Sequence, residues 1–516
     1  MDSSFSSGDP SSRSAIRGGG PMTAIGDPGR TPAPGGRARA DACPGALHVH
    51  QAADGGLARI RVPGGHVTAP QLRLLAAFAP VELTSRANIQ MRGLASGAEL
   101  PLAARLADAG LLPSRTHERV RNIVASPFSG LDDQSLLDVA PLATALDAAL
   151  CAAPALAALP GRFLFALDDG RGDATALDAD VTAVPLGGGT PDRTAKAGPP
   201  QVALLLAGVD TGLRVPAAHA VAAMLAAASA FLDEVAADGT RAWRIAELPD
   251  GPRRVTARLL TAPHRATSLY GTAPSTSAPA TGPLPMAPAS ADPDGGPLPV
   301  PPSPVPRSAV PPGPVPRSAV PPGPVPPGPV AQLDGRVALA LAVPLGRLTS
   351  AQLDLLAEAS EATGRAVRLT PWRGVVVPGL AAADLDAWTE RLAAAGLVAD
   401  PASPWVGVTA CTGRPGCAKS LADVQADAAA AVDASAVDAS AVGLGAARPA
   451  EAGTLPVHRA PVHWAGCARR CGRPKGRVVD VVATGNGYRV DFGNVGVNCA
   501  DLQETVAATA AVRGER

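Results

Sequence analysis

The chain has 516 residues, and its 45 basic and 45 acidic side chains give a formal net charge of zero. A neutral chain is poorly suited to non-specific binding of nucleic acid or of anionic membranes. Hydrophobic residues make up 46% of the chain, which excludes wholesale disorder, and aromatic residues make up 3%, which argues against base-stacking platforms.

The N-terminal residues 1–42 are polar and rich in glycine and proline, and they lack the apolar core of a signal peptide. The longest apolar stretch, residues 215–232, is mostly alanine and includes His219, which predicts a buried helix rather than a membrane span. Seven cysteines in a chain of this length do not form a disulfide framework. We therefore expect a soluble cytoplasmic protein with a disordered tail and with thiols that are available to metals.

Two segments, residues 54–94 and 334–380, share one pattern. Each predicts a strand, a turn, a helix and two further strands. Both helices begin with a T-x-x-Q capping box, formed by Thr68 with Gln71 and by Thr349 with Gln352. A repeated α+β module of this kind predicts two half-domains that pair as a pseudo-twofold platform.

A proline-rich segment separates the two modules, because residues 271–330 contain 22 of the 55 prolines. Such a sequence favours extended polyproline II and predicts a semi-rigid spacer. An alanine-rich stretch at 426–452 is expected to be an exposed insertion. The predicted organisation is a disordered tail (1–42), a first half-domain (43–114), a first α/β domain (115–262), a Pro-rich disordered linker (263–332), a second half-domain (333–403) and a last domain (404–516).

Four cysteines form two closely spaced pairs, Cys411 with Cys417 and Cys467 with Cys471. Four thiolates suit either a tetrahedral zinc ion or a 4Fe–4S cluster. Paired zinc ligands usually have about two to four residues between them, so the five-residue spacing of the first pair favours the cluster. The pattern after Cys417 predicts a helix whose N-terminus would stabilise that thiolate.

The other cysteines carry weaker signals. Cys151 lies in an apolar helical pattern and is expected to be a small core residue. Cys43 and Cys499 remain further candidate ligands. Basic residues near the four paired cysteines would offset the negative charge of a cluster, although a solvated surface is the alternative interpretation.

The order of three motifs resembles the sulfite/nitrite reductase superfamily. They are T-S-R-A-N-I-Q-M-R-G from Thr84, V-R-N-I-V-A-S-P-F-S-G-L-D from Val120, and C-x5-C with C-x3-C. The resemblance covers both halves of the chain but not the tail or the linker. It implies an α+β fold with two ferredoxin-like half-domains and two sulfite/nitrite reductase-type α/β domains in a pseudo-twofold arrangement, the last of which binds a 4Fe–4S cluster.

Within that superfamily the chain most resembles the precorrin-3B synthase family of aerobic cobalamin biosynthesis. The cues are A-C-P-G-A-L from Ala42, R-L-T-P-W-R from Arg368 and A-C-T-G-R-P-G-C-A-K from Ala410. The resemblance implies a monooxygenase that uses O2 to convert precorrin-3A, a tetrapyrrole, into precorrin-3B by meso hydroxylation with γ-lactone formation. It also implies a 4Fe–4S cluster, a mononuclear non-haem iron and an external reductant, either NADH or an electron-donor protein such as reduced ferredoxin.

Arginines are the expected substrate ligands, because planar guanidinium groups bind the carboxylates of a tetrapyrrole. Arg86 and Arg92 share the polar face of a predicted strand with residues 88 and 90. By resemblance, Arg86 and Arg121 are implied to be catalytic and, together with Arg92 and Arg162, to bind substrate. Arg162 stands where the reductases carry a lysine, which argues against sulfite or nitrite chemistry.

Weaker candidates and two alternative functions remain open. Arg373 and His463 are possible site residues, His463 as a buried neutral imidazole. A sirohaem-dependent sulfite or nitrite reductase would use the same four cysteines, and a zinc-stabilised binding protein would need no catalysis. No G-x-G-x-x-G fingerprint for NAD or flavin follows a predicted strand, so electrons are expected from a partner or from NADH bound by an unrecognised route. We expect no nucleic-acid and no membrane partner.

Overall fold

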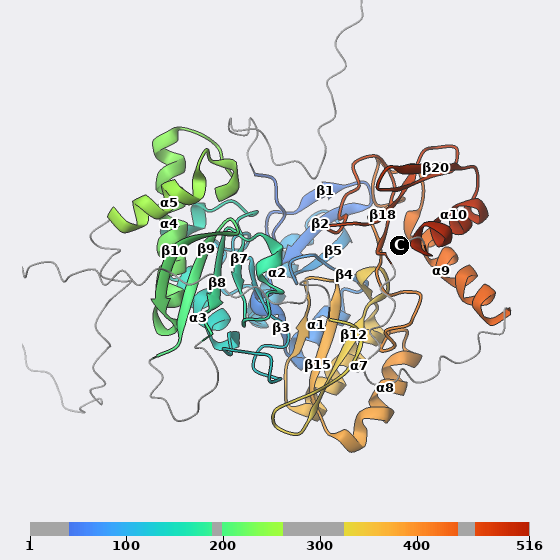
Figure 1. Cartoon of the computed structure of the whole chain (residues 1–516), viewed down its shortest axis with the longest axis horizontal. Helices are drawn as coiled ribbons and strands as arrows, with labels where there is room; N and C mark the ends of the chain where they lie inside the picture. Colours follow the sequence, from blue (N-terminus) through green and yellow to red (C-terminus); the bar gives the residue numbers. More distant parts are fainter. Residues whose placement is uncertain (1–40, 188–198, 262–324, 442–459, 515–516) are drawn as a thin grey trace, which may run out of the picture.

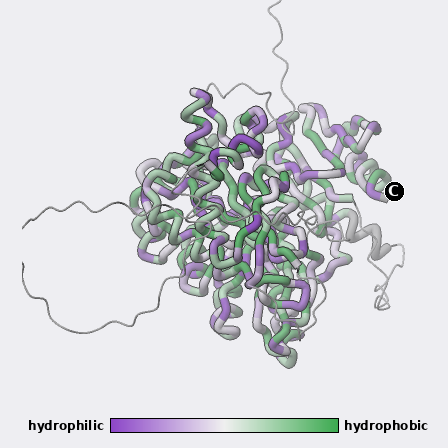
Figure 2. The backbone as a smooth tube through the Cα atoms, turned by 60° about the vertical axis from the view of Figure 1, so that its left-hand side comes forward, coloured by the Kyte–Doolittle hydropathy of each residue, from purple (hydrophilic) through white to green (hydrophobic). Residues whose placement is uncertain are grey.

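The computed structural model describes residues 41–187, 199–261, 325–441 and 460–514. Most of the expected tail and most of the expected linker lie outside these residues. Figure 1 shows the two half-domains in the middle of the molecule, with one α/β domain on each side. Figure 2 shows hydrophobic and hydrophilic stretches interleaved throughout the folded body, as expected for several packed cores rather than one.

Each half-domain is built on a five-stranded antiparallel sheet. Sheet A has the order β1 (His50–Ala52), β2 (Gly55–Ile60), β5 (Ile89–Leu94), β4 (Val81–Leu83), β13 (Arg347–Leu348). Sheet B has the order β11 (Gly328–Ala331), β12 (Val337–Ala342), β15 (Gly374–Leu380), β14 (Val367–Leu369), β3 (His66–Val67). The accompanying helices are α1 (Ala69–Ala76), α2 (Glu99–Asp108), α7 (Ser350–Thr363) and α8 (Leu385–Ala394).

The two half-domains exchange edge strands. Strand β3 of the first half pairs with β14 of the second, and β13 of the second half pairs with β4 of the first. Helices α1 and α7 begin at the two predicted capping boxes and pack against each other in one shared core. The pseudo-twofold repeat predicted from the sequence is therefore present, and each half completes the other's sheet.

The two α/β domains share a second topology, in which three parallel strands are followed by two antiparallel ones. Sheet C has the order β10 (Val209–Pro216), β9 (Gln201–Leu206), β8 (Val181–Pro185), β7 (Phe165–Leu167), β6 (Ile123–Ala125). Sheet D has the order β16 (Val408–Ala410), β17 (Val462–Ala465), β18 (Val479–Ala483), β19 (Tyr488–Phe492), β20 (Val495–Cys499). Their helices are α3 (Ala140–Cys151), α4 (Ala220–Asp238), α5 (Gly251–Thr261), α9 (Val424–Ala441) and α10 (Leu502–Gly514).

Helix α4, with the turn before it, is long and apolar enough to cross a membrane by length and composition alone. Met224, Ala227 and Phe231 are nevertheless fully buried, and the helix contacts β8, β10 and α3. The packing confirms the predicted core helix.

Three local expectations differ from the structure. Strand β11 begins at Gly328, inside the expected linker, because its backbone pairs with β12 as an edge strand. The helix predicted directly after Cys417 begins only at Val424, since residues 417–420 form a turn closed by the bond from Ser420 N to Cys417 O. The first turns of α9 lie in the core through Val424, Ala428 and Val432, so the alanine-rich stretch is not a simple exposed insertion where it is described.

Candidate functional site

The structure brings the four paired cysteines together at one edge of sheet D. Cys411 directly follows β16, and Cys467 and Cys471 follow the neighbouring parallel strand β17. The C-terminal ends of parallel neighbours lie at the same sheet edge. Burial and then the other three cysteines raise the pKa of the Cys471 thiol, which shows that all four sulfurs are within electrostatic reach of one another.

The arrangement of these sulfurs fits a cubane cluster better than a single ion. Among the described residues, no three cysteine sulfurs lie within 4.8 Å of one another, whereas one tetrahedral ion holds all of its ligands close. In a cubane each cysteine binds a different iron, which spreads the sulfurs. Gly466 N donates a hydrogen bond to Cys411 Sγ at 3.2 Å, and such donors stabilise cluster thiolates. The residues present therefore fit a 4Fe–4S cluster.

The equivalent position in the first α/β domain carries oxygen instead of sulfur. Ser126 follows β6 as Cys411 follows β16, and the two backbone N–H groups bond to Leu167 O and Trp464 O at 3.0 and 2.9 Å. Asp169 N donates to Ser126 Oγ at 3.1 Å, as Gly466 N does to Cys411 Sγ. The pseudo-twofold therefore relates a serine site to the cysteine site.

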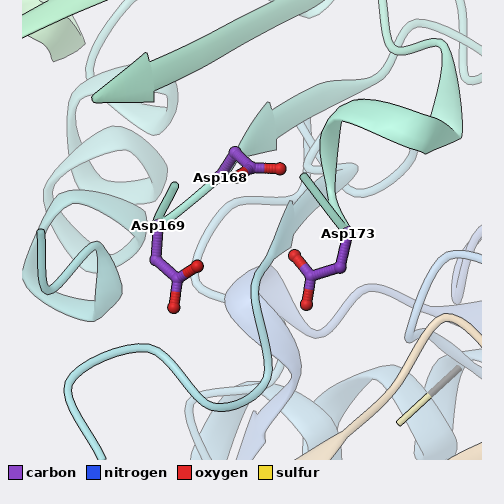
Figure 3. Close-up of side chains that lie close together, drawn as sticks. All are labelled: Asp168, Asp169 and Asp173. Atoms are coloured by element: carbon purple, nitrogen blue, oxygen red, sulfur yellow. The ribbon is translucent and has the colours of Figure 1, made fainter. Parts of the chain in front are cut away.

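Three aspartates converge beside Ser126, as Figure 3 shows for Asp168, Asp169 and Asp173. Their oxygens already have donors: Asp168 accepts the N–H groups of residues 170, 172 and 175, and Asp169 pairs with Arg171 at 2.9 Å. Only Asp173 Oδ2 lacks a partner, and burial with Asp168 raises the pKa of Asp173 to about 7. The three aspartates therefore stabilise a loop, and they do not offer the free ligand set that a mononuclear iron needs.

A cluster of arginines lies near sheet A and the adjoining end of sheet C. Arg59 and Arg61 flank the end of β2, and Arg86 lies in the turn before β5. Burial together with Arg59 and Arg86 lowers the pKa of Arg61 to about 9, and burial together with Arg244 lowers the pKa of Arg86 to about 10. These shifts mean that the cationic groups lie close together away from water.

Within the described residues, some guanidinium donors of these arginines lack a hydrogen-bond acceptor. Asp180 pairs with Arg244 at 2.5 Å, but Arg59 Nε and Arg61 Nη1 are buried donors without a hydrogen-bond partner. Arg61 Nε and Nη2 reach only backbone oxygens, those of Arg119 and Pro44. Buried donors normally have hydrogen-bond partners, so the arginine cluster is suited to a polyanionic ligand.

Side chains of sheet A, followed by Arg373 from the turn between β14 and β15 of sheet B, lie between the arginine cluster and the cysteines. Arg59 Nη2 donates to Gln90 Oε1 at 2.8 Å, and Gln90 Nε2 donates to Glu82 Oε2 at 2.8 Å. Burial lowers the pKa of Arg373, and its neighbours Glu82 and Cys411 oppose that shift. Arg373 Nη2 also donates to Gly472 O at 3.3 Å, next to Cys471. The arginine cluster and the cysteines therefore lie near each other and are treated together as the candidate site.

The arginines that were predicted to bind substrate do not all lie together. Arg86 belongs to the arginine cluster, and Arg162 is exposed over the ring of Trp243 at 5.3 Å. Arg121 is 3% exposed and makes a two-point ion pair with Asp147, both bonds 2.7 Å. Asp147 therefore holds Arg121 in place, and the expected contact of Arg121 with substrate stays a prediction.

Arg92 has its own partners as well. It forms a two-point ion pair with Asp54 and donates to Gly416 O at 2.6 Å, so it holds the cysteine loop. Its expected contact with substrate stays a prediction. The alternating polar face expected from residue 86 to residue 92 is interrupted, because Ala87 has a positive φ of 52° and β5 begins only at Ile89. Asn88 is buried and accepts from Val62 N.

The weaker candidates also have definite positions. His463 is fully buried, and burial with Arg373 lowers its pKa to about 3, so the ring is neutral as expected. Cys43 lies within electrostatic reach of Arg59 and Arg162. Cys499 is buried in the core of the last domain.

Sequence reasoning missed Arg59 and Arg61. Their signal was the R-I-R run that ends β2, where two cations alternate with the core residue Ile60. None of the motifs that carried the resemblance includes Arg59 or Arg61.

Comparisons with known proteins agree with this architecture. The nitrite/sulfite reductase ferredoxin-like half domain matches residues 48–109 and 330–395. Over 127 residues the chain is 35% identical to a ferredoxin–nitrite reductase of Synechococcus elongatus, and over 118 residues it is 32% identical to a precorrin-3B synthase of a Sinorhizobium species. Each alignment covers 22% of this chain and 25% of the relative, so the chain aligns with only about a quarter of either relative's length.

A solved structure extends the likeness to the whole fold. The NirA protein of Mycobacterium tuberculosis superimposes with a TM-score of 0.61 at 19% identity, over 89% of this chain and 82% of that one. At this identity the match shows a shared fold alone. The chain therefore contains two nitrite/sulfite reductase ferredoxin-like half domains, and its four sheets share the fold of that solved structure.

Proposed function

We propose that this protein is a 4Fe–4S oxidoreductase that converts precorrin-3A into precorrin-3B with O2, by meso hydroxylation and γ-lactone formation. The observation that carries the proposal is the incompletely paired arginine cluster of Arg59, Arg61 and Arg86, which lies near the four gathered cysteines. A ligand with many carboxylates would supply the missing partners.

Each part of the site has a separate task. The cluster, held by Cys411, Cys417, Cys467 and Cys471, would supply electrons one at a time when bound. The arginines would grip the carboxylates of the macrocycle and so fix the meso carbon, because a bound ligand that is held in one orientation reacts faster. Arg61 is 2% exposed. Water would therefore be excluded from an ion pair between Arg61 and a bound carboxylate, and the low dielectric constant would strengthen that pair.

The precorrin-3B synthase relative supports this assignment, as does Arg162 at the position of a reductase lysine. The second candidate is a sirohaem-dependent sulfite or nitrite reductase, which the match to the Synechococcus enzyme favours. Sirohaem is also a polycarboxylate, so the same arginines would serve either function. The cytoplasm is the expected compartment in both cases.

Anaerobic purification followed by two assays separates the candidates. With precorrin-3A, O2 and a reductant, the synthase assignment predicts a product heavier by one oxygen atom. Strong sirohaem absorbance with turnover of sulfite or nitrite, and no change in precorrin-3A, would establish the reductase instead. One zinc per chain without iron or acid-labile sulfide would exclude both and indicate a zinc-stabilised binding protein.

A further inference from the structure

A short segment before β1, residues 41–48, lies against the arginine cluster and is fixed at both ends; we call it the strap. It contains no helix or strand. At the end nearest β1, two backbone N–H groups donate hydrogen bonds to the buried carboxylate of Glu118. At the other end, Asp41 Oδ2 accepts a hydrogen bond from Gly161 N at 2.5 Å. These bonds to the first α/β domain hold the strap in place.

Cys43 of the strap lies among the arginines of the cluster. Arg61 Nη2 donates to Pro44 O at 3.2 Å, which places that guanidinium group beside the residue that follows Cys43. The thiol is also within electrostatic reach of Arg59 and Arg86. Three cationic groups from sheet A and its turns therefore surround this one thiol.

The turn at Gly161 lies against another side of Cys43. A Cβ atom at Gly161 would lie 2.9 Å from Cys43 Cβ, so the turn and the strap are in close contact. The next residue, Arg162, is exposed and lies within electrostatic reach of the thiol. Cys43 itself is only partly buried. The thiol therefore has both buried and exposed arginines as neighbours.

The thiol leaves the hydrogen-bonding capacity of these arginines unused. Arg61 is 2% exposed, and within the described residues its Nη1 donor has no partner. Nη1 belongs to the same planar group as the Nη2 that bonds to the strap, so the unpaired donor lies beside the strap. Burial and the neighbouring Asp41 raise the pKa of the Cys43 thiol, which keeps it neutral, and a thiol is only a weak acceptor.

A metal ion is a poor fit at this thiol. The arginines around Cys43 repel a cation, and a thiol must lose its proton before it binds a metal. The nearby carboxylate of Asp41 already accepts the N–H groups of Cys43 and Gly161. An anionic ligand suits these surroundings instead, because it would pair with the arginines and would not compete with a neutral thiol.

We propose that Cys43 is a contact residue for the bound tetrapyrrole, whose ring packs against the thiol while the surrounding arginines bind its carboxylates. The strap is then a fixed wall of the binding site. A small, polarizable thiol suits contact with a ring, and its lack of charge leaves the arginines to the ligand. This inference rests on the proposed function, because it requires that the arginine cluster bind a tetrapyrrole. No covalent bond forms between Cys43 and the ligand.

The first test measures how fast iodoacetamide alkylates Cys43 in the cluster-containing protein, with each cysteine followed separately by peptide mass spectrometry. Because only ligand-free protein reacts, precorrin-3A without O2, at about ten times its Kd, should slow alkylation of Cys43 roughly tenfold. The matched control is a thiol introduced by Ala393→Cys, at an exposed position of α8 in the second half-domain. Its alkylation rate should not change when precorrin-3A is added.

The second test fills the proposed contact with a bulky group. Wild type carrying N-ethylmaleimide on Cys43 should bind precorrin-3A, again without O2, about tenfold or more weakly than untreated wild type, because the adduct occupies the place of the ring. Cys43→Ser receives the same treatment, and its affinity should be the same before and after. This comparison separates the effect of the adduct on Cys43 from reactions at the other cysteines.

An anionic reagent reports the arginines without any ligand. The rate with iodoacetate relative to iodoacetamide should be higher at Cys43 than at the Ala393→Cys thiol, and added salt should reduce that preference. Equal ratios at the two thiols would contradict the position of Cys43 among the cations and overturn the inference.

The remaining outcomes distinguish this inference from the proposed function. If the preparation converts precorrin-3A once O2 is admitted, but precorrin-3A does not protect Cys43 or the maleimide adduct keeps full affinity, only the role of Cys43 is wrong. A preparation that contains iron and sulfide but neither binds nor converts precorrin-3A would overturn the proposed function, and the contact at Cys43 with it.

Discussion

Arg92 Nη2 donates a hydrogen bond to the carbonyl oxygen of Gly416 at 2.6 Å, and this bond joins the first half-domain to the cysteine loop of the last domain. The same guanidinium group is held by Asp54 through two bonds of 3.0 Å. A Cβ atom at Gly416 would lie 2.7 Å from Thr412 Cγ2, 2.8 Å from Asp54 Oδ2 and 3.1 Å from Arg92 Nη2, so a side chain there would crowd this ion pair. The site therefore depends on contacts between segments more than 300 residues apart in the sequence.

Replacing Arg92 with methionine should loosen the loop that carries Cys417 without altering a cysteine. Groups that orient metal ligands typically contribute about 10–100-fold to metal affinity, so we expect the variant to lose its cluster to a chelator about tenfold faster. Iron and acid-labile sulfide per chain, followed over time, provide the measurement. Arg73→Met is the matched control, because Arg73 joins the two halves through an exposed ion pair with Glu361 far from the cysteine loop.

Replacing Arg86 with methionine should separate ligand binding from stability. Its guanidinium group has no hydrogen-bond partner among the described residues, and burial with Arg244 lowers its pKa to about 10. Removing this buried charge should raise the Tm of the ligand-free protein, while affinity for a polycarboxylate tetrapyrrole falls by about tenfold or more. Arg365→Met, on the surface of the second half-domain, should leave affinity unchanged. A variant with lower Tm and intact affinity would show that Arg86 is structural.

Replacing Arg121 should lower stability and preserve ligand affinity, which is the reverse of the result expected for Arg86. Because its ion pair with Asp147 is largely buried, Arg121→Met should lower the free energy of unfolding by about 3 kcal/mol, with tetrapyrrole affinity of the folded variant preserved. Asp147→Asn should cause a similar loss, and the double variant should cost less than the sum of the two. Denaturant unfolding measures both. A variant with full stability and lost tetrapyrrole affinity would show that Arg121 binds substrate.

His66 should make stability depend on pH at the seam between the half-domains. It lies on β3 opposite Arg368 of β14, and burial with Arg368 lowers its pKa from 6.5 to about 4. Between these values the unfolded chain binds the proton and the folded one does not. Stability is therefore full above pH 6.5 and falls as the pH drops toward 4, by at most about 3 kcal/mol.

Urea unfolding at several pH values tests this dependence. His66→Gln should flatten the stability curve between pH 6.5 and 4, and His50→Gln, at an exposed position, should keep the wild-type slope. An unchanged slope in His66→Gln would mean that other groups cause the acid destabilisation.

The sequence predicts the repeated elements well because their signals are local. The T-x-x-Q boxes at Thr68 and Thr349 start helices where expected, and the four cysteines do assemble. The partners of individual arginines were not predictable, because Asp147, Asp54 and Gly416 are distant in sequence from the arginines they bind. The exchange of β3 and β13 between sheets and the serine–cysteine equivalence of Ser126 and Cys411 likewise appear only when strand order is known.

The most direct test of the account follows oxygen into the product. Cluster-containing protein with precorrin-3A, 18O2 and a one-electron donor should give a product that carries one 18O atom, and Cys411→Ser should lose both the cluster and this activity. Unlabelled precorrin-3A after incubation with cluster-containing wild type, or full activity in a Cys411→Ser variant without iron, would contradict it.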